Sequence, residues 1–253
     1  MTAEATTHLT TSSKATKVIG SVALFAGALT LIFGLIVAPA HIEQGESARL
    51  LFIHVPSVIA TYLSYFITLV GSAIYLRKKS LFWDRVAGSA AEVGSVFCAI
   101  LLFSGSVWGR PTWGTFWVWD PRLTSTAVMF VSYLGYLAVR RMDMEPAARR
   151  RRSAIIGILA FVNVLIVHYS VDWWRGLHQS RTFEPSDVQI EGWYLLSFFF
   201  GSVFFVGAAL WLLIHRFRLS HLESQAQAAK LEQLIDLRQS GGVENANSKE
   251  TVV

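Results

Sequence analysis

The chain of 253 residues is 53% hydrophobic and only 15% charged, and its mean hydropathy is +0.45. This composition excludes an ordinary soluble globular protein and indicates a membrane protein. The net charge of +5 suggests nucleic-acid binding at first sight, but the placement of the basic residues, described below, excludes it. Cys98 is the only cysteine, so the chain can form neither an internal disulfide nor a C-x-x-C redox pair.

Six apolar runs are long enough to cross a bilayer, which takes about 20 helical residues. Backbone polar groups must be paired within the segment in hydrocarbon, and the runs lack the alternation of barrel strands, so we expect helices. The expected spans are residues 18–40, 50–76, 86–107, 123–139, 154–170 and 193–214. The predicted fold class is therefore all-α: a polytopic membrane protein with six transmembrane helices.

The basic residues are distributed unevenly between the two sides of these spans. With the N-terminus inside, 17 of the 22 Lys and Arg residues fall in inside segments. The five that fall outside are Arg49, Arg110, Arg122, Arg175 and Arg181. Because short cytoplasmic loops are enriched in Lys and Arg, this distribution predicts that both termini are cytoplasmic. The predicted outer loops are residues 41–49, 108–122 and 171–192.

Three regions follow one another along the chain. Residues 1–17 are predicted to be a mobile cytoplasmic N-terminus, and residues 18–215 the six-helix membrane domain. The first span ends in Ala38-Pro39-Ala40, which imitates a signal-peptide cleavage site, but its length favours a retained helix. Residues 216–253 are predicted to hold a cytoplasmic helix that ends near Gly241-Gly242 and a disordered tail.

The second outer loop is unusually rich in tryptophan. It reads WGRPTWGTFWVWDPR and contains Trp108, Trp113, Trp117 and Trp119. Seven of the nine tryptophans are predicted to lie outside, whereas an aromatic belt places them at both interfaces. If residues 112–120 take helical turns, one face holds Trp113, Phe116, Trp117 and Asp120. Such a surface suits a flat, apolar ligand with acidic groups at one edge, and haem has that shape.

Two histidines are candidate iron ligands. His54 lies one turn inside the outer end of the second span, and His178 lies in the third outer loop. Neutral imidazole is a common ligand of haem iron, and an ionisable residue within a membrane span is a functional candidate by default. His41 and His168 also lie near the outer surface, and spacing alone does not separate the four.

Charged residues near these histidines suggest how acidic groups would be held. The guanidinium groups of Arg49 and Arg122 match carboxylates and are candidates for haem propionates; lipid phosphate or Asp120 are alternative partners. Asp120 itself is a candidate for orienting a histidine or holding Arg122. Glu92, inside the third span, must face a partner, water or another helix, and we assign it no role.

The segment WGRPTWGTFWVWDPRLTS resembles the tryptophan-rich WWD signature of haem-handling membrane proteins. HVP at residues 54–56, WWRGLHQ at residues 173–179 and the six-span length make residues 18–215 similar to the family of cytochrome c maturation protein C, CcmC, also called haem exporter protein C. The larger relatives CcmF and CcsA have more helices. Phe116 and Pro121 depart from the residues expected in some members.

The resemblance implies a haem site on the periplasmic face of a bacterial inner membrane. Its axial ligands would be His54 and His178, and Arg49 and Arg122 would engage propionates of a non-covalent, transient haem b. The loop with Trp108, Trp113, Trp117, Trp119 and Asp120 would present haem to the haem chaperone CcmE.

The resemblance also implies partners: CcmD and the ABC-type pair CcmA and CcmB. The sequence lacks a phosphate-binding G-x-x-x-x-G-K-[ST] loop, so ATP hydrolysis would come from a partner, and we do not expect an enzyme. Two alternatives stay open. A haem transporter would need polar residues inside the membrane, where Asn163 and Glu92 are the main candidates. An electron carrier would hold haem between histidines on two helices, whereas His178 is predicted in a loop.

Overall fold

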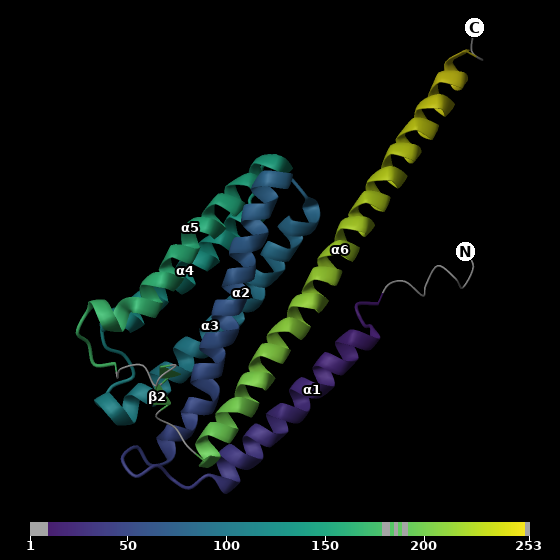
Figure 1. The fold of residues 1–253 in the computed structure, drawn as a ribbon. Coiled ribbons are helices and arrows are strands. Elements are labelled where there is room, and N and C mark those ends of the chain that lie inside the picture. The colour runs from purple at the N-terminus through teal and green to yellow at the C-terminus, as the bar shows by residue number, and fades with distance from the viewer. Residues whose placement is uncertain (1–9, 179–182, 185–186, 189–191, 251–253) are drawn as a thin grey trace.

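A computed structural model describes residues 10–178, 183–184, 187–188 and 192–250 of the chain (Figure 1). The elements are α1 (Lys14–Leu31), the π-helix η2 (Ile32–Val37), the 3-10 helix η3 (Glu46–Leu50), α2 (Leu51–Lys78), α3 (Leu81–Trp113), α4 (Pro121–Arg141), α5 (Pro146–Trp173), β1 (Phe183–Glu184), β2 (Asp187–Val188) and α6 (Gly192–Glu250). Six helices within the described residues are long and apolar enough to cross a membrane. The predicted all-α polytopic fold is confirmed, with one unpredicted addition, the antiparallel pairing of β1 with β2.

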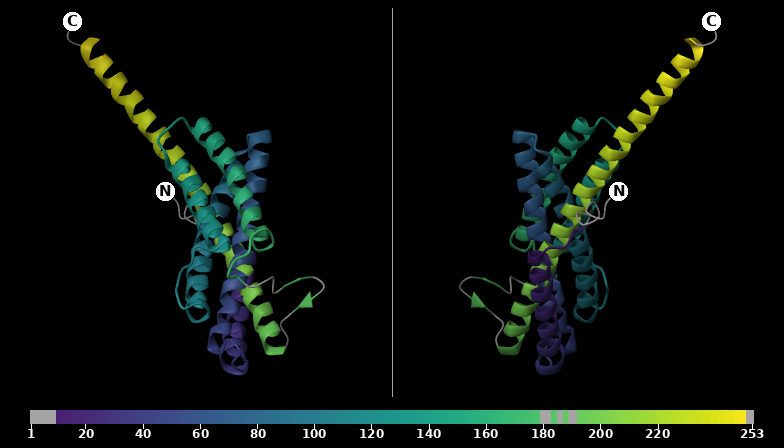
Figure 2. Two further views of the ribbon diagram at one scale, coloured as in Figure 1. Left: turned by 90° about the vertical axis from the view of Figure 1, so that its left-hand side faces the viewer. Right: turned by 90° about the vertical axis from the view of Figure 1, so that its right-hand side faces the viewer.

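The helices form three neighbouring pairs (Figure 1). α1 packs along α6, α2 along α3, and α4 along α5, and α2 also contacts both α5 and α6. The side views in Figure 2 show the same arrangement, with α6 extending far beyond the other helices. The start of α1 and the end of α6 lie on the same side of the bundle, together with the α2–α3 and α4–α5 connections. The basic segments are thus gathered at one end, which we predict to be cytoplasmic.

Two buried clusters hold the pairs together. Between α2, α3, α4 and α5, the rings of Tyr65 and Tyr133 stack with centroids 3.4 Å apart, next to Cys98 and Met129. Gly94 allows this packing, because a Cβ there would lie 2.6 Å from the Tyr65 ring. The second cluster joins α2 and α3 to α6 and consists of Ala60, Val93, Phe97, Phe205 and Ala209. Small residues therefore bring the helices close, as is usual in membranes.

Several predicted boundaries are corrected by the structure. α1 begins at Lys14, where the Ser13 side chain accepts the Thr16 N–H in a capping box, and residues 1–9 lie outside the described residues. α6 is one helix from Gly192 to Glu250, so it continues past the predicted end at Gly241-Gly242. Gln179, Arg181 and residues 251–253 are also outside the described part of the chain.

Glu92 has a partner that the sequence did not reveal. Its carboxylate pairs with the guanidinium of Arg216 on α6, with 3.2 Å between Glu92 Oε1 and Arg216 Nη2. Arg216 also lies 3.3 Å from Glu223. The carboxylate inside α3 is therefore neutralised by a helix far away in sequence, as a charge near hydrocarbon requires.

Candidate functional site

A cavity of about 310 Å³ lies at the end of the bundle opposite the basic segments. Its walls come from the start of α2, the end of α3, the start of α4, the end of α5 and the segment after α5. The lining includes His54, Trp108, Trp113, Trp117, Arg122, His168 and His178, with Val55, Val58, Leu101 and Leu102 among the apolar residues. The cavity thus brings together residues from all three predicted outer loops.

His54 is held in the cavity wall by α3. Its Nδ1 lies 3.1 Å from Ser104 Oγ, and its ring packs edge-on against Trp108 at 5.7 Å between centroids. Because Nδ1 is engaged by the Ser104 hydroxyl, which also lies 3.2 Å from the Leu101 carbonyl, Nε2 is the ring nitrogen left for a ligand. Gly105 makes room for the ring, because a Cβ there would lie 2.9 Å from His54 Cε1.

His178 enters the same cavity from the segment after α5. Its ring centroid lies 5.2 Å from that of Trp113, and its Nδ1 lies 3.6 Å from Asp120 Oδ1. Burial, followed by the positive charge of Arg122, lowers the pKa of His178 to about 4, against the opposing effect of Asp120. His178 is therefore neutral at pH 7, which is the form that ligates metal.

Asp120 organises the two outer segments. It is buried and caps α4, where one carboxylate oxygen accepts the Arg122 N–H at 2.8 Å. The other oxygen accepts the Leu177 N–H, also at 2.8 Å, which fixes the chain next to His178. Gly176 permits this approach, because a Cβ there would lie 2.0 Å from Asp120 Oδ2. The sequence Trp-Asp-Pro-Arg thus supplies a cap, a proline in the first helical turn and a tie to the next loop.

The shared aromatic face, which was predicted on the condition that residues 112–120 take helical turns, is not formed because most of this segment is not helical. α3 continues through Trp108 to Trp113 and ends at Gly114, whose φ of +77° is the left-handed conformation that glycine adopts easily. Residues 114–120 are not helical, so Trp113, Phe116, Trp117 and Asp120 are not aligned by helical turns. The loop between the helices is correspondingly shorter than predicted.

The tryptophans also differ in their relation to the cavity. Trp108, Trp113 and Trp117 line it, whereas Trp119 is 82% exposed and lies outside the lining, edge-on to Trp117. The Trp108 indole N–H donates to Gln44 Oε1 at 3.1 Å. The buried Trp117 Nε1 has no hydrogen-bond partner among the described residues, so it is an unmatched donor at the cavity wall.

The two arginines predicted to hold acidic groups are placed differently. Arg122 lines the cavity, and its Nη2 lies 3.4 Å from the His168 carbonyl. Arg49 does not line it: its guanidinium pairs with Glu46 and donates to the Gly34 carbonyl in η2. The geometry therefore brings Arg122 to the histidines and leaves Arg49 at the η2–η3 corner.

The two alternative ligands, His168 and His41, differ in their position relative to the cavity. His168 lines the cavity, while His41 is outside the lining and its Nδ1 accepts the N–H groups of Glu43 and Gln44 at 3.2 and 3.3 Å. Sequence reasoning missed the residues that shape the wall, namely Gln44, Tyr62, Ser104, Gly105 and Gly176. No local pattern marks them, since their role depends on which helices become neighbours.

Fold and cavity together define a polytopic membrane protein with a cavity lined by tryptophan and histidine at one end of its helices. A family model described as "CcmC: Heme exporter protein C" matches residues 1–232. The chain therefore belongs to the CcmC family.

Relatives in several organisms agree with this assignment. The chain is 32% identical over 191 residues to a "Putative cytochrome c biosynthesis ccmC-like mitochondrial protein" of Marchantia polymorpha, covering 75% of this chain and 81% of the relative. It is 40% identical over 147 residues to "Heme exporter protein C" of Bradyrhizobium diazoefficiens, covering 56% and 54%. For the protein of that name in Escherichia coli strain K12, identity is 38% over 151 residues, covering 60% and 62%. The matched part thus spans little more than half of some relatives.

Proposed function

We propose that the chain binds haem non-covalently in the outer cavity and presents it to the haem chaperone CcmE during cytochrome c maturation. The observation that carries the proposal is the meeting of His54, His178 and Arg122 with three tryptophans in one cavity. These residues come from five separate segments of the chain: α2, α3, the α3–α4 loop, α4 and the segment after α5. The names of the relatives, which refer to haem export and cytochrome c biosynthesis, support the same ligand class.

The residues present fit haem on several physical grounds. Apolar helix residues and indole rings match the faces of a macrocycle, and Arg122 matches a propionate. The unmatched Trp117 Nε1 supplies a further donor for a polar group of the ligand. Within the described residues no group of three His, Cys, Asp or Glu side chains is placed to hold a metal ion. Two histidines alone suit a haem iron, because the porphyrin supplies the other ligands of that ion.

In this proposal His54 and His178 supply the axial nitrogens. The His54 ring is held at Nδ1 by Ser104 Oγ, and His178 is placed by the Leu177 N–H bond to Asp120, whose carboxylate lies 3.6 Å from His178 Nδ1. Neutral His178 needs no deprotonation at pH 7 before it can bind. The exposed Trp119, next to Trp117 at the cavity, offers the contact surface for the chaperone.

The contacts of the two polar residues within the spans favour delivery over passage through the bilayer. Glu92 pairs with Arg216, and the Asn163 amide donates to Ser132 Oγ at 2.9 Å. Both groups are engaged in holding helices together and do not line the cavity. We propose that the CcmA–CcmB pair provides ATP hydrolysis and that CcmD completes the complex in the bacterial inner membrane, with the cavity on the periplasmic face.

The test is the absorption spectrum of the detergent-purified protein, oxidised and dithionite-reduced, after loading with haem. We expect a low-spin bis-histidine spectrum that is lost in His54→Ala/His178→Ala and kept in His41→Ala, whose ring lies outside the cavity. His168→Ala distinguishes the third cavity histidine and is expected to keep the spectrum. Its loss in His168→Ala, or its retention in the double variant, would overturn the ligand assignment.

A glycine pair tests the cavity shape without removing a ligand. Gly105→Ala places a methyl group 2.9 Å from His54 Cε1 and is expected to weaken haem binding about tenfold, roughly 1.4 kcal/mol. Gly135→Ala is the matched control, because a Cβ there meets nothing within 4 Å. Equal haem affinity in the two variants would show that the position of His54 is not important.

A further inference from the structure

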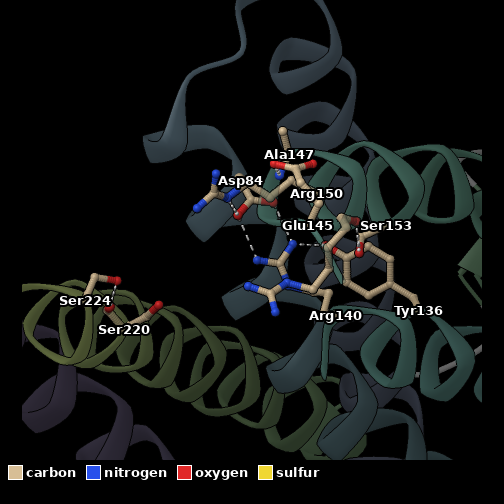
Figure 3. Close-up of polar contacts among 10 residues, drawn as sticks. Asp84, Tyr136, Arg140, Glu145, Ala147, Arg150, Ser153, Ser220 and Ser224 are labelled. Carbon is tan, nitrogen blue, oxygen red and sulfur yellow. Dashed lines mark hydrogen bonds and ion pairs between the residues drawn. The ribbon is translucent and has the colours of Figure 1, made fainter. Parts of the chain in front are cut away.

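A second cavity, of about 200 Å³, lies at the end of the bundle that carries the basic segments. It is walled by the start of α3, the end of α4, the start of α5 and the part of α6 that leaves the bundle (Figure 3). Its lining residues are Leu81, Asp84, Arg85, Arg140, Arg149, Arg150, Ser153, Ser220, Ser224 and Gln227. None of them belongs to the outer cavity.

The lining carries a large excess of positive charge. It has four arginines and a single carboxylate, that of Asp84. Arg140 engages Asp84 through two hydrogen bonds of 2.8 and 3.0 Å, and Arg150 lies 3.9 Å from the same carboxylate (Figure 3). Glu145 nearby is occupied at the start of α5, where it accepts the N–H groups of Ala147 and Ala148. One carboxylate therefore balances one of four guanidinium groups in a confined space.

Contacts with neighbouring residues hold two of these arginines, Arg140 and Arg85, in place. Asp84 is buried and fixes the plane of the Arg140 guanidinium, and Gly88 leaves the space for it, since a Cβ there would lie 2.7 Å from Arg140 Cζ. Arg85 Nη1 lies 2.9 Å from His221 Nδ1, which ties α3 to α6. The hydroxyls of Ser153 and Ser224 donate to backbone carbonyls within their helices, so the arginines are left as the donors for a bound anion.

The cavity sits where the apolar spans end. The α4 span ends at Arg141 and the α5 span begins at Pro146, so Arg140, Arg149 and Arg150 lie at the boundary between hydrocarbon and water. Leu81 and Phe82 at the start of α3 are 45% and 50% exposed next to it. A ligand here would meet guanidinium groups on one side and apolar surface on the other, which is the environment of a phospholipid phosphate.

We propose that this cavity binds the phosphate group of an anionic phospholipid, whose acyl chains lie along the exposed start of α3. Guanidinium groups match phosphate oxygens through paired hydrogen bonds, and basic pockets between helices at the cytoplasmic side bind such headgroups. A lipid phosphate bound by Arg149 and Arg150, in a cavity that α6 also lines, would hold the polar extension of α6 against the ends of α3–α5. This inference is independent of the proposed haem function.

The experiment titrates the detergent-purified full chain with phosphatidylglycerol, phosphatidylcholine and inorganic phosphate and measures binding by microscale thermophoresis. The test variant is Arg149→Gln/Arg150→Gln, and the control is Arg151→Gln/Arg152→Gln, an equal loss of charge in the same helix turn outside the lining. We expect preferred binding of phosphatidylglycerol, weakened at least about tenfold by the test pair and less than about threefold by the control pair.

Three outcomes would overturn the proposal. Equal binding of both lipids would show that the phosphate site does not select anionic lipid, and equal weakening by both variants would leave only a diffuse attraction to positive charge. Binding of inorganic phosphate as tight as that of phosphatidylglycerol would reassign the cavity to a soluble anion. Ser224→Glu, which adds a carboxylate to the lining from the part of α6 that leaves the bundle, is a second variant and is expected to weaken lipid binding in the same way.

Discussion

The two ends of the helical bundle each hold a cavity beside a buried aspartate, but the two aspartates have different partners. Asp120 accepts backbone N–H groups of Arg122 and Leu177 and lies 3.6 Å from a histidine. Asp84 instead accepts both N–H bonds of the Arg140 guanidinium. The first cavity is therefore built around neutral rings and the second around an excess of guanidinium groups. A buried carboxylate can thus position either kind of site, depending on what it binds.

The largest effect is expected where the carboxylate pairs with a charge. Asp84→Ala leaves the mostly buried Arg140 guanidinium without its counter-ion and is expected to destabilise the protein by about 3 kcal/mol. Thermal unfolding in detergent measures this loss. Asp143→Ala, in the exposed α4–α5 connection, is the control and is expected to change stability by less than about 0.5 kcal/mol. Similar melting temperatures for the two variants would contradict the importance of the ion pair.

A smaller loss of stability but a larger loss of function is expected at the other end. Asp120→Ala removes the α4 cap and leaves the Leu177 N–H without its acceptor. Together these losses are expected to lower the folding stability by about 2 kcal/mol. Because the same carboxylate accepts the Leu177 N–H and so fixes the chain next to His178, the haem spectrum is expected to disappear as well. Asp120→Asn keeps one acceptor oxygen and should retain part of both. A stable Asp120→Ala protein with a normal spectrum would show that His178 is positioned by other contacts.

Lowering the pH is expected to reduce the folding stability of the haem-free protein, because His178 is held neutral in the folded state. Its pKa in the folded state is about 4, below the ordinary value of 6.5, so the unfolded chain binds the proton first as the pH falls. The contribution of His178 to stability is complete above pH 6.5 and is lost between pH 6.5 and 4, with a slope of at most about 1.4 kcal/mol per pH unit. Melting temperatures across this range should fall less steeply in His178→Gln. Parallel curves would mean that the histidine is not protected from protonation by the fold.

How far the sequence predicted these features depends on whether the signal is local. The apolar spans are local signals, and all six are found, although the predicted third span stops at Val107 while α3 continues to Trp113. Gly109 and Pro111 are residues that usually end helices, and here the end is set by Gly114 instead. The start of α4 was readable, since Asp120-Pro121 is a typical cap followed by proline.

The cavities were predictable only in part, because they depend on which helices become neighbours. His54 and His178 were found from residue type and predicted side, yet Ser104 and Gly105, which hold His54, follow from the packing of α2 on α3. Arg49 was expected near the ligand, but the Gly34 carbonyl and Glu46 draw its side chain to the corner after η2. The arginine cavity was invisible for the same reason, since α6 reaches it only because the helix continues beyond the bundle.

The smallest effect on stability is expected for Trp119→Ala. Comparing this variant with Trp117→Ala separates haem binding from contact with the chaperone. Trp119→Ala removes a ring that is 82% exposed, so stability should change by less than about 0.5 kcal/mol and haem content should stay normal. Trp117→Ala removes a cavity wall with a buried indole nitrogen and should lower haem content. If Trp119 serves the chaperone, haem transfer to CcmE should slow in Trp119→Ala although the protein is fully loaded. Loss of loading in both variants would instead make Trp119 part of the binding surface, and normal transfer in Trp119→Ala would move the chaperone contact elsewhere on the outer face.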